Sequence, residues 1–138
     1  MELSDEIHVK ILKLCERGDE LLDENKVDLA ITKYLSALEL VPNPKSDWEA
    51  STWIYTTLGE IYLINKEFNI AKEYFYNALN CPDGISNPLI LLRIGETLFE
   101  TQDLEQSREY LLRAYMLEGQ DIFGEEDEKY FNSIKSLI

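Results

Sequence analysis

Residues 55–82 read YTTLGEIYLINKEFNIAKEYFYNALNCP, and the small residues in this stretch decide the fold. Gly59 is followed by Ala71 and then by Ala78, in a pattern that otherwise predicts helix. A glycine inside a helix costs roughly 1 kcal/mol relative to alanine, so its presence indicates a geometric requirement. The requirement that fits is the close approach of two paired helices.

The same spacing of small residues occurs twice more in the chain. The first copy has Gly18, Ala30 and Ala37, and the third copy has Gly95, Ser107 and Ala114. Three copies of one spacing of small residues along a chain are the signature of a stacked helical repeat. Repeat proteins of this kind offer extended binding surfaces, so the pattern favours binding over catalysis.

Large residues keep a constant register around the small ones. They are Leu14, Leu21 and Tyr34 in the first copy, Tyr55, Leu58, Tyr62 and Phe75 in the second, and Leu91, Ile94, Leu98 and Leu111 in the third. Pro42 and Pro82 close the first two copies, and Gly119 stands near the corresponding place in the third. The whole pattern resembles the tetratricopeptide repeat, in which small residues of one helix pack against large residues of its antiparallel neighbour.

The resemblance implies an all-α fold, a right-handed superhelical array of three helix pairs with a C-terminal capping helix. We expect one domain over residues 1–138, with repeats at about 4–42, 46–82 and 87–119 and the capping helix at about 125–137. Ser4 and Asn87 are expected to cap helices, and Ser46 to begin one with Glu49 completing a capping box. The acidic residues 125–128 are expected in the first turn of the last helix, where they interact favourably with the helix dipole.

Charge and composition narrow the classes of partner. The net charge is −14, which repels phosphate, so neither nucleic acid nor an anionic membrane surface is an expected partner. No apolar run is long enough to span a membrane, and the first residues lack the pattern of a secretory signal, so we expect a cytoplasmic protein. Cys15 and Cys81 have no spacing that indicates a disulfide framework or a metal site.

One face of the first helix in each pair is predicted to bind a partner. Counting 100° per residue from Trp53 separates this face from the core face that carries Leu58 and Tyr62. In proteins of the family that the chain resembles, the corresponding face lines a concave groove that holds a peptide or a partner's helix. The predicted groove residues are Leu12, Cys15, Asp19, Leu22, Trp53, Thr56, Glu60, Leu63, Ile64, Leu89, Leu92, Arg93, Glu96 and Phe99.

An acidic residue follows each repeat glycine: Asp19, Glu60 and Glu96. We expect these carboxylates to form a column along the groove, with Arg93 able to pair with a neighbouring one. Such a surface suits a protein or peptide that carries basic and apolar residues. The alternative is that acidic residues are simply common on solvated helix faces.

The groove differs from that of the chaperone-binding members of the family. Many of those members hold a partner's C-terminal carboxylate with a clamp of lysine, asparagine and arginine. Here the corresponding positions hold Cys15, Asp19, Thr56, Glu60 and other residues that are not basic, with only Arg93 basic nearby. An acidic chaperone tail is therefore not the expected ligand.

No pattern in the sequence predicts an enzyme, a cofactor or a metal ion. His8 is the single histidine and has no cysteine or serine partner at a recognisable spacing. We therefore predict a non-enzymatic adaptor or scaffold that binds a protein segment. Two alternatives stay open: an immunity or inhibitor protein that masks a basic toxin or enzyme, and a secretion chaperone. Self-association, and occupation of the groove by the chain's own terminal helices, also stay open.

Overall fold

The structure is a computed structural model that describes residues 3–138, so residues 1–2 of the expected domain lie outside the described part. The described residues form helices and no strand. The α-helices are α1 (Asp5–Asp23), α2 (Val27–Leu40), α3 (Glu49–Ile64), α4 (Phe68–Leu79), α5 (Pro88–Glu100), α6 (Leu104–Glu118) and α7 (Glu128–Ile134). Short 3-10 helices occupy Lys45–Asp47 (η1), Gln120–Phe123 (η2) and Lys135–Leu137 (η3).

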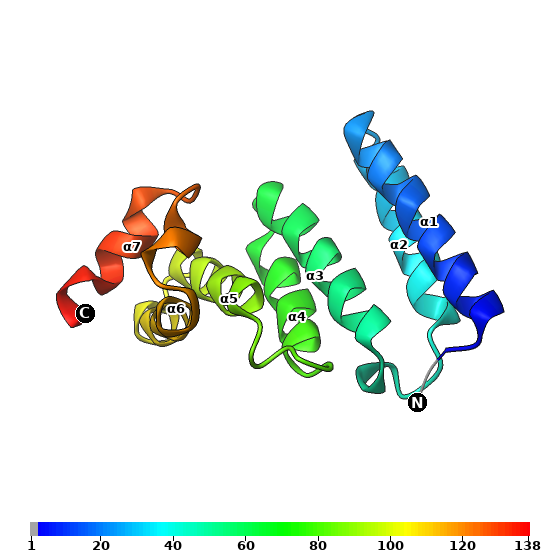
Figure 1. The fold of residues 1–138 in the computed structure, drawn as a ribbon. Coiled ribbons are helices and arrows are strands. Elements are labelled where there is room, and N and C mark those ends of the chain that lie inside the picture. Colours follow the sequence, from blue (N-terminus) through cyan, green and yellow to red (C-terminus); the bar gives the residue numbers. More distant parts are fainter. Residues whose placement is uncertain (1–2) are drawn as a thin grey trace.

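The helices form three hairpins that stack in chain order (Figure 1). In each hairpin, α1 with α2, α3 with α4, and α5 with α6, the two helices lie side by side, and α7 follows on α6 at the C-terminal end. This is a right-handed superhelical array of three helix pairs with a capping helix, as predicted. Among the described residues, no helix is both long enough and apolar enough to cross a membrane.

Each repeat glycine lies against a large side chain of the partner helix, at the same spacing along the chain in every repeat. A Cβ atom on Gly59 would lie 2.6 Å from Cε1 of Phe75, and one on Gly18 would lie 2.8 Å from Cζ of Tyr34. In the third hairpin a Cβ atom on Gly95 would lie 2.6 Å from Cδ2 of Leu111. Real Cβ contacts are essentially never this short, so the glycines are required for the helices of each pair to approach.

The third repeat departs from the pattern without losing its packing. Ser107 stands where the other copies have alanine, and it is fully buried. Its hydroxyl donates a hydrogen bond of 2.7 Å to the carbonyl of Gly95, so the polar atom is satisfied inside the hairpin. The third copy is therefore a complete helix pair.

The turn within each hairpin contains a residue with left-handed backbone conformation that is not glycine. These residues are Asn25, Lys66 and Gln102, with φ of 60°, 63° and 70°. The residue after each of them donates its amide back to the fifth residue before it, as Glu67 does to Tyr62 at 2.9 Å. This pattern closes a helix C-terminus and normally takes glycine.

We expect Lys66→Gly to stabilise the protein by about 0.5 to 1 kcal/mol, because glycine removes the left-handed strain at the price of a more flexible unfolded chain. Asn25→Gly is the matched control, since asparagine adopts this conformation more easily than lysine does and less is gained. Urea unfolding of both variants checks this. A Lys66→Gly variant less stable than the parent would contradict it.

Two predicted helix starts are wrong. Ser46 lies in η1, and α3 begins at Glu49 after Trp48, so Glu49 does not complete a capping box with Ser46. The last helix begins at Glu128, not near 125, and Asp127 caps it by accepting a hydrogen bond from the Lys129 amide. Ser4 and Asn87 cap α1 and α5 as predicted.

Candidate partner-binding groove

A hollow of about 450 Å³ lies where α3 meets the connection between α4 and α5. Four of the predicted groove residues line it together: Trp53, Thr56, Glu60 and Leu89. The other lining residues are Glu49, Thr52, Thr57, Pro82, Asp83 and Asn87. The structure thus brings together predicted residues of the second repeat and the first predicted residue of the third.

A second hollow, of about 570 Å³, lies between the start of α1 and the start of α3. Its lining residues are Leu3, Asp5, His8, Asp47, Trp48, Glu49, Ala50, Trp53 and Pro82. Trp53, Glu49 and Pro82 line both hollows, and the Trp53 side chain is 37% exposed. Trp53 is therefore the one aromatic side chain that both hollows share. We call the two hollows together the Trp53 groove.

Side-chain hydrogen bonds hold the walls of the Trp53 groove in place. The hydroxyl of Thr52 donates to the carbonyl of Pro82 at 2.9 Å, which ties α3 to the connection that precedes α5. The hydroxyl of Thr56 donates to the carbonyl of Thr52 at 2.7 Å. Both threonines are buried. Their hydroxyls are thus used within the wall of the groove.

The rim of the Trp53 groove is acidic. Asp5, Asp47, Glu49 and Asp83 line it, and none of these four carboxylates forms an ion pair within residues 3–138. Four unpaired carboxylates around an exposed indole give a surface of negative potential with an apolar centre.

The predicted acidic column does not line an open groove. The hydroxyl of Tyr34 donates a hydrogen bond to Asp19, so this carboxylate has a partner in its own hairpin. Glu96 is almost fully buried, with its side chain 3% exposed, and Glu60 is paired with Arg93. Each carboxylate of the predicted column therefore already has a partner in the fold.

Arg93 on α5 is surrounded by three carboxylates from three parts of the chain. Its Nε lies 3.1 Å from Glu60 of α3, and its Nη1 lies 2.9 Å from Glu96 of α5 and 2.6 Å from Glu126, which precedes α7. The Arg93 side chain is 18% exposed. The expected pairing of Arg93 with neighbouring carboxylates is thus confirmed. Glu126 does not lie in the first helical turn as predicted, because it binds this arginine instead.

Burial and the surrounding charges shift the pKa values of this cluster. Burial, together with a hydrogen bond to Glu126, raises the pKa of Glu96 to about 8 in spite of Arg93. Burial opposes ionisation of Glu126 as well, but its hydrogen bond with Glu96 and the charge of Arg93 hold its pKa below the usual range. Arg93 has its own pKa raised by these carboxylates, which outweigh its burial. Burial therefore favours the neutral, protonated form of Glu96 in this cluster.

The C-terminal segment covers the third-repeat part of the predicted groove. Leu92 is 1% exposed and packs in one cluster with Phe123 and Ile134. Phe99 packs edge to face on Tyr130, with ring centroids 5.3 Å apart. The prediction that Leu92, Glu96 and Phe99 line an open groove is wrong, because η2 and α7 pack on this face.

Comparison with protein families identifies the repeat. The model of the tetratricopeptide repeat matches residues 54–80 and 89–121, which include most of α3, the whole of α4 and α6, and nearly all of α5. Residues 54–80 and 89–121 are therefore tetratricopeptide repeats. Its first hairpin lies outside the matched residues but has the same contact between glycine and a large partner side chain.

Solved tetratricopeptide structures share the fold of the whole chain. The first domain of Spaghetti (RPAP3), bound to the HSP90 peptide SRMEEVD, has a TM-score of 0.70 at 21% identity, covering 93% of this chain and 90% of that one. The N-terminal domain of stress-induced protein-1 from C. elegans has a TM-score of 0.73 at 15% identity, covering 97% and 98%. The second domain of human RPAP3, in complex with the HSP70 peptide SGPTIEEVD, has a TM-score of 0.70 at 14% identity, covering 95% and 97%. No curated protein matches the sequence significantly.

The remaining predicted residues of the tetratricopeptide groove lie outside the Trp53 groove. Cys15 is buried in the core, where burial and the nearby Asp19 raise the pKa of its thiol to about 11. The thiol is thus protonated at neutral pH and is a poor nucleophile. Leu22 and Leu63 are half-buried against the core clusters. Leu12 and Ile64 are exposed on α1 and α3, 45% and 78% respectively.

Several residues of the Trp53 groove were not predicted from the sequence. Glu49 precedes Trp53 by one helical turn, so extending the same helical phase would have found it. Pro82 and Asp83 gave no such signal, because they belong to the connection after α4 and reach the groove only through stacking of the hairpins. Among residues 3–138 no group of three or more histidine, cysteine or acidic side chains is placed to hold a metal ion.

Proposed function

We propose that this tetratricopeptide protein is a non-enzymatic interaction module that binds a protein segment at the Trp53 groove, the segment carrying a lysine or arginine beside an apolar side chain. The observation that carries the proposal is a partly exposed tryptophan shared by two hollows and surrounded by four unpaired carboxylates. Tryptophan is enriched among the residues that dominate binding energy, and acidic neighbours attract a basic partner.

In this proposal residues 1–138 form one domain, and its three stacked repeats hold a single groove in place. The ligand does not occupy the whole predicted groove, because η2 and α7 cover the part of it that the third repeat forms. The ligand is thus expected along the first two repeats and the start of α5. No membrane surface or nucleic acid is proposed as a partner, because the net charge of −14 opposes both.

Acidic chaperone tails are not the proposed ligand, although two of the similar structures hold HSP90 or HSP70 peptides. Arg93 is the single basic residue among the predicted groove residues, and three carboxylates already bind it. A peptide that ends in acidic residues would face Glu49, Asp83 and their neighbours without a free cation to receive it.

The proposal predicts which substitutions weaken binding. We expect random short peptides selected on the protein to be enriched in lysine or arginine beside an aromatic or aliphatic residue. Trp53→Ala should weaken binding of the selected peptides at least tenfold, because a tryptophan anchor contributes about 2 kcal/mol. Glu49→Lys should also weaken peptide binding, and the loss of affinity should be larger at low salt than at high salt. Fluorescence anisotropy of labelled peptides measures both effects.

Matched controls separate binding from folding. Glu39→Lys makes the same charge change on an exposed residue of α2, which does not line the groove, and it should leave affinity nearly unchanged. The labelled peptide SRMEEVD should show no binding. Selection of acidic peptides, or equal affinity of the parent and Trp53→Ala, would overturn the proposal. Unfolding curves of each variant show whether its fold is retained.

A further inference from the structure

The segment between α6 and the end of α7 is attached to the array by two kinds of contact. Phe123 and Ile134 are buried in the third core cluster, and Tyr130 donates a hydrogen bond of 2.7 Å to Glu100 of α5. Lys129 pairs with the same Glu100. These contacts hold the segment at η2 and at α7, and Glu126 attaches the turn between them through Arg93.

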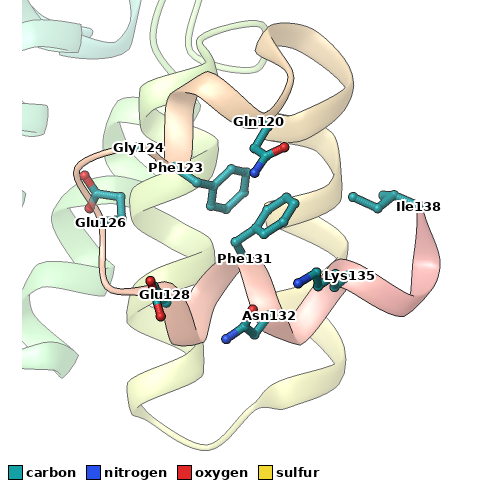
Figure 2. A pocket seen from close by; sticks show the side chains of 9 residues that line it. All are labelled: Gln120, Phe123, Gly124, Glu126, Glu128, Phe131, Asn132, Lys135 and Ile138. Atoms are coloured by element: carbon teal, nitrogen blue, oxygen red, sulfur yellow. The ribbon is translucent and has the colours of Figure 1, made fainter.

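A hollow lies within the C-terminal segment itself. A hollow of about 540 Å³ lies between η2 and α7, with Phe123 and Phe131 facing each other in it (Figure 2). Glu126 and Ile138 lie at opposite edges of this hollow (Figure 2). All of its lining residues come after α6 in the chain, so the hollow separates η2 from α7 and not the segment from α5 or α6.

The attachment at Glu126 has an unusual charge balance. Three carboxylates surround one arginine, so full ionisation would leave two surplus negative charges around Arg93. Glu96 is the most deeply buried of the three, and no described side chain or backbone group donates a hydrogen bond to its Oε2. An ionised Glu96 would therefore place an unsatisfied charge in the interior, which is strongly unfavourable.

We propose that Glu126, Arg93 and Glu96 form a proton-dependent latch, which holds residues 119–134 over the third-repeat part of the groove while Glu96 is neutral and releases them when Glu96 loses its proton. Release uncovers Leu92 and Phe99, so the latch sets how many repeats present an open concave face. The proposal concerns the protein alone and does not require that the Trp53 groove bind any particular peptide.

The direction of the pH dependence follows from the two forms of Glu96. When the segment is released we expect the pKa of Glu96 to return towards its ordinary value of 4.5, because the burial that raises it to about 8 in the closed form is lost. Between these values the closed form holds a proton that the open form has lost. Closure is therefore fully favoured below the ordinary pKa and is weakened as the pH rises towards 8.

The charged groups around Glu96 support this direction. Arg93 on its own helix favours the ionised form, whereas Glu60 of α3 and Glu126 of the turn oppose it. From α7, Lys129 is engaged by Glu100, and Tyr130 donates to the same carboxylate. Burial and the bond to Glu100 keep the pKa of Tyr130 above its ordinary range, so Tyr130 stays neutral where Glu96 titrates.

Amide hydrogen exchange measured by mass spectrometry tests the latch. After division by the intrinsic exchange rate, protection of residues 119–134 should fall by up to about tenfold per pH unit between pH 6 and pH 8, as expected when opening releases one proton. Protection of α1 and α2 should change much less. In Glu96→Gln, which keeps a neutral group of the same size, protection of residues 119–134 should not depend on pH.

Glu125→Gln is the matched control, since Glu125 is the exposed neighbour of Glu126 and forms no ion pair among residues 3–138. It should retain the pH dependence of the parent. A carbon-13 carboxyl NMR titration, with Glu96 assigned from the Glu96→Gln spectrum, gives a second reading. A Glu96 midpoint at its ordinary value, equal protection of residues 119–134 across this pH range, or parallel loss of protection throughout the chain would each overturn the latch. Peptide binding at the Trp53 groove can succeed or fail independently of these results.

Discussion

Replacing Gly59 with leucine is expected to lower the free energy of unfolding by about 3 kcal/mol, the upper end of the usual cost of overpacking. A Cβ atom at this position would lie 2.6 to 2.9 Å from three atoms of the Phe75 ring, and Phe75 is completely buried. The ring has no free space to move into, so α3 and α4 must separate. Urea unfolding followed by circular dichroism measures the loss.

A double-mutant cycle tests the cause of this loss. Phe75→Ala alone should cost about 3 to 5 kcal/mol, because it leaves a cavity in the core. Combined with Gly59→Leu, the two costs should not add, since the leucine side chain can enter the space that the ring has left. Asn69→Leu on the exposed side of α4 is the control for adding an apolar side chain. Additive losses, or a Gly59→Leu protein as stable as the parent, would contradict close packing of the hairpin.

Replacing Arg93 with methionine is expected to destabilise the protein by about 3 to 5 kcal/mol at pH 7.5, because removing one partner of a buried ion pair leaves the other charges uncompensated. Here Glu60 and Glu126 would lose the cation that pairs with their charges, and Glu96 would lose the hydrogen bond that Arg93 donates to it. Arg113→Met removes an arginine from an exposed pair with Glu109 and should change stability by less than about 1 kcal/mol.

The effect of Arg93→Met should depend on pH in a defined direction. Arg93 helps to hold the pKa of Glu126 below 4.5, so its stabilising contribution is present above that pH and is lost as the pH falls through the lower folded value. The difference in stability between the parent and Arg93→Met should therefore shrink towards pH 4. Equal differences at pH 7.5 and pH 4 would show that Arg93 acts through packing of its aliphatic part alone.

The sequence predicted the repeat itself because the decisive contacts are local. Gly59 and Phe75 belong to adjacent helices of one hairpin and are close in the chain, so their spacing is visible in the sequence. The same holds for Gly18 and Tyr34. The left-handed backbone conformation of Lys66 and Gln102 could not be predicted, because neither residue type is typical of that conformation.

Part of the candidate site could also be predicted. Helical phase placed Trp53, Thr56 and Glu60 on one face, and the structure gives them a common hollow. Phase gives the direction of a side chain from its own helix. It does not show what lies opposite, and for this reason Asp83, the Tyr34 partner of Asp19 and the burial of Glu96 were not predicted.

Taken by itself, the sequence determined the all-α hairpin array, the pairing of small with large residues and the net charge, since these depend on residue type and short spacings. Only the tertiary structure decided which groove residues remain open. Glu126 reaches Arg93, and Tyr130 reaches Phe99, across a whole helix and two connections of intervening chain. Such contacts depend on where the C-terminal segment folds back on the array. The raised pKa of Glu96 is a consequence of that folding, because burial is the largest cause of the shift.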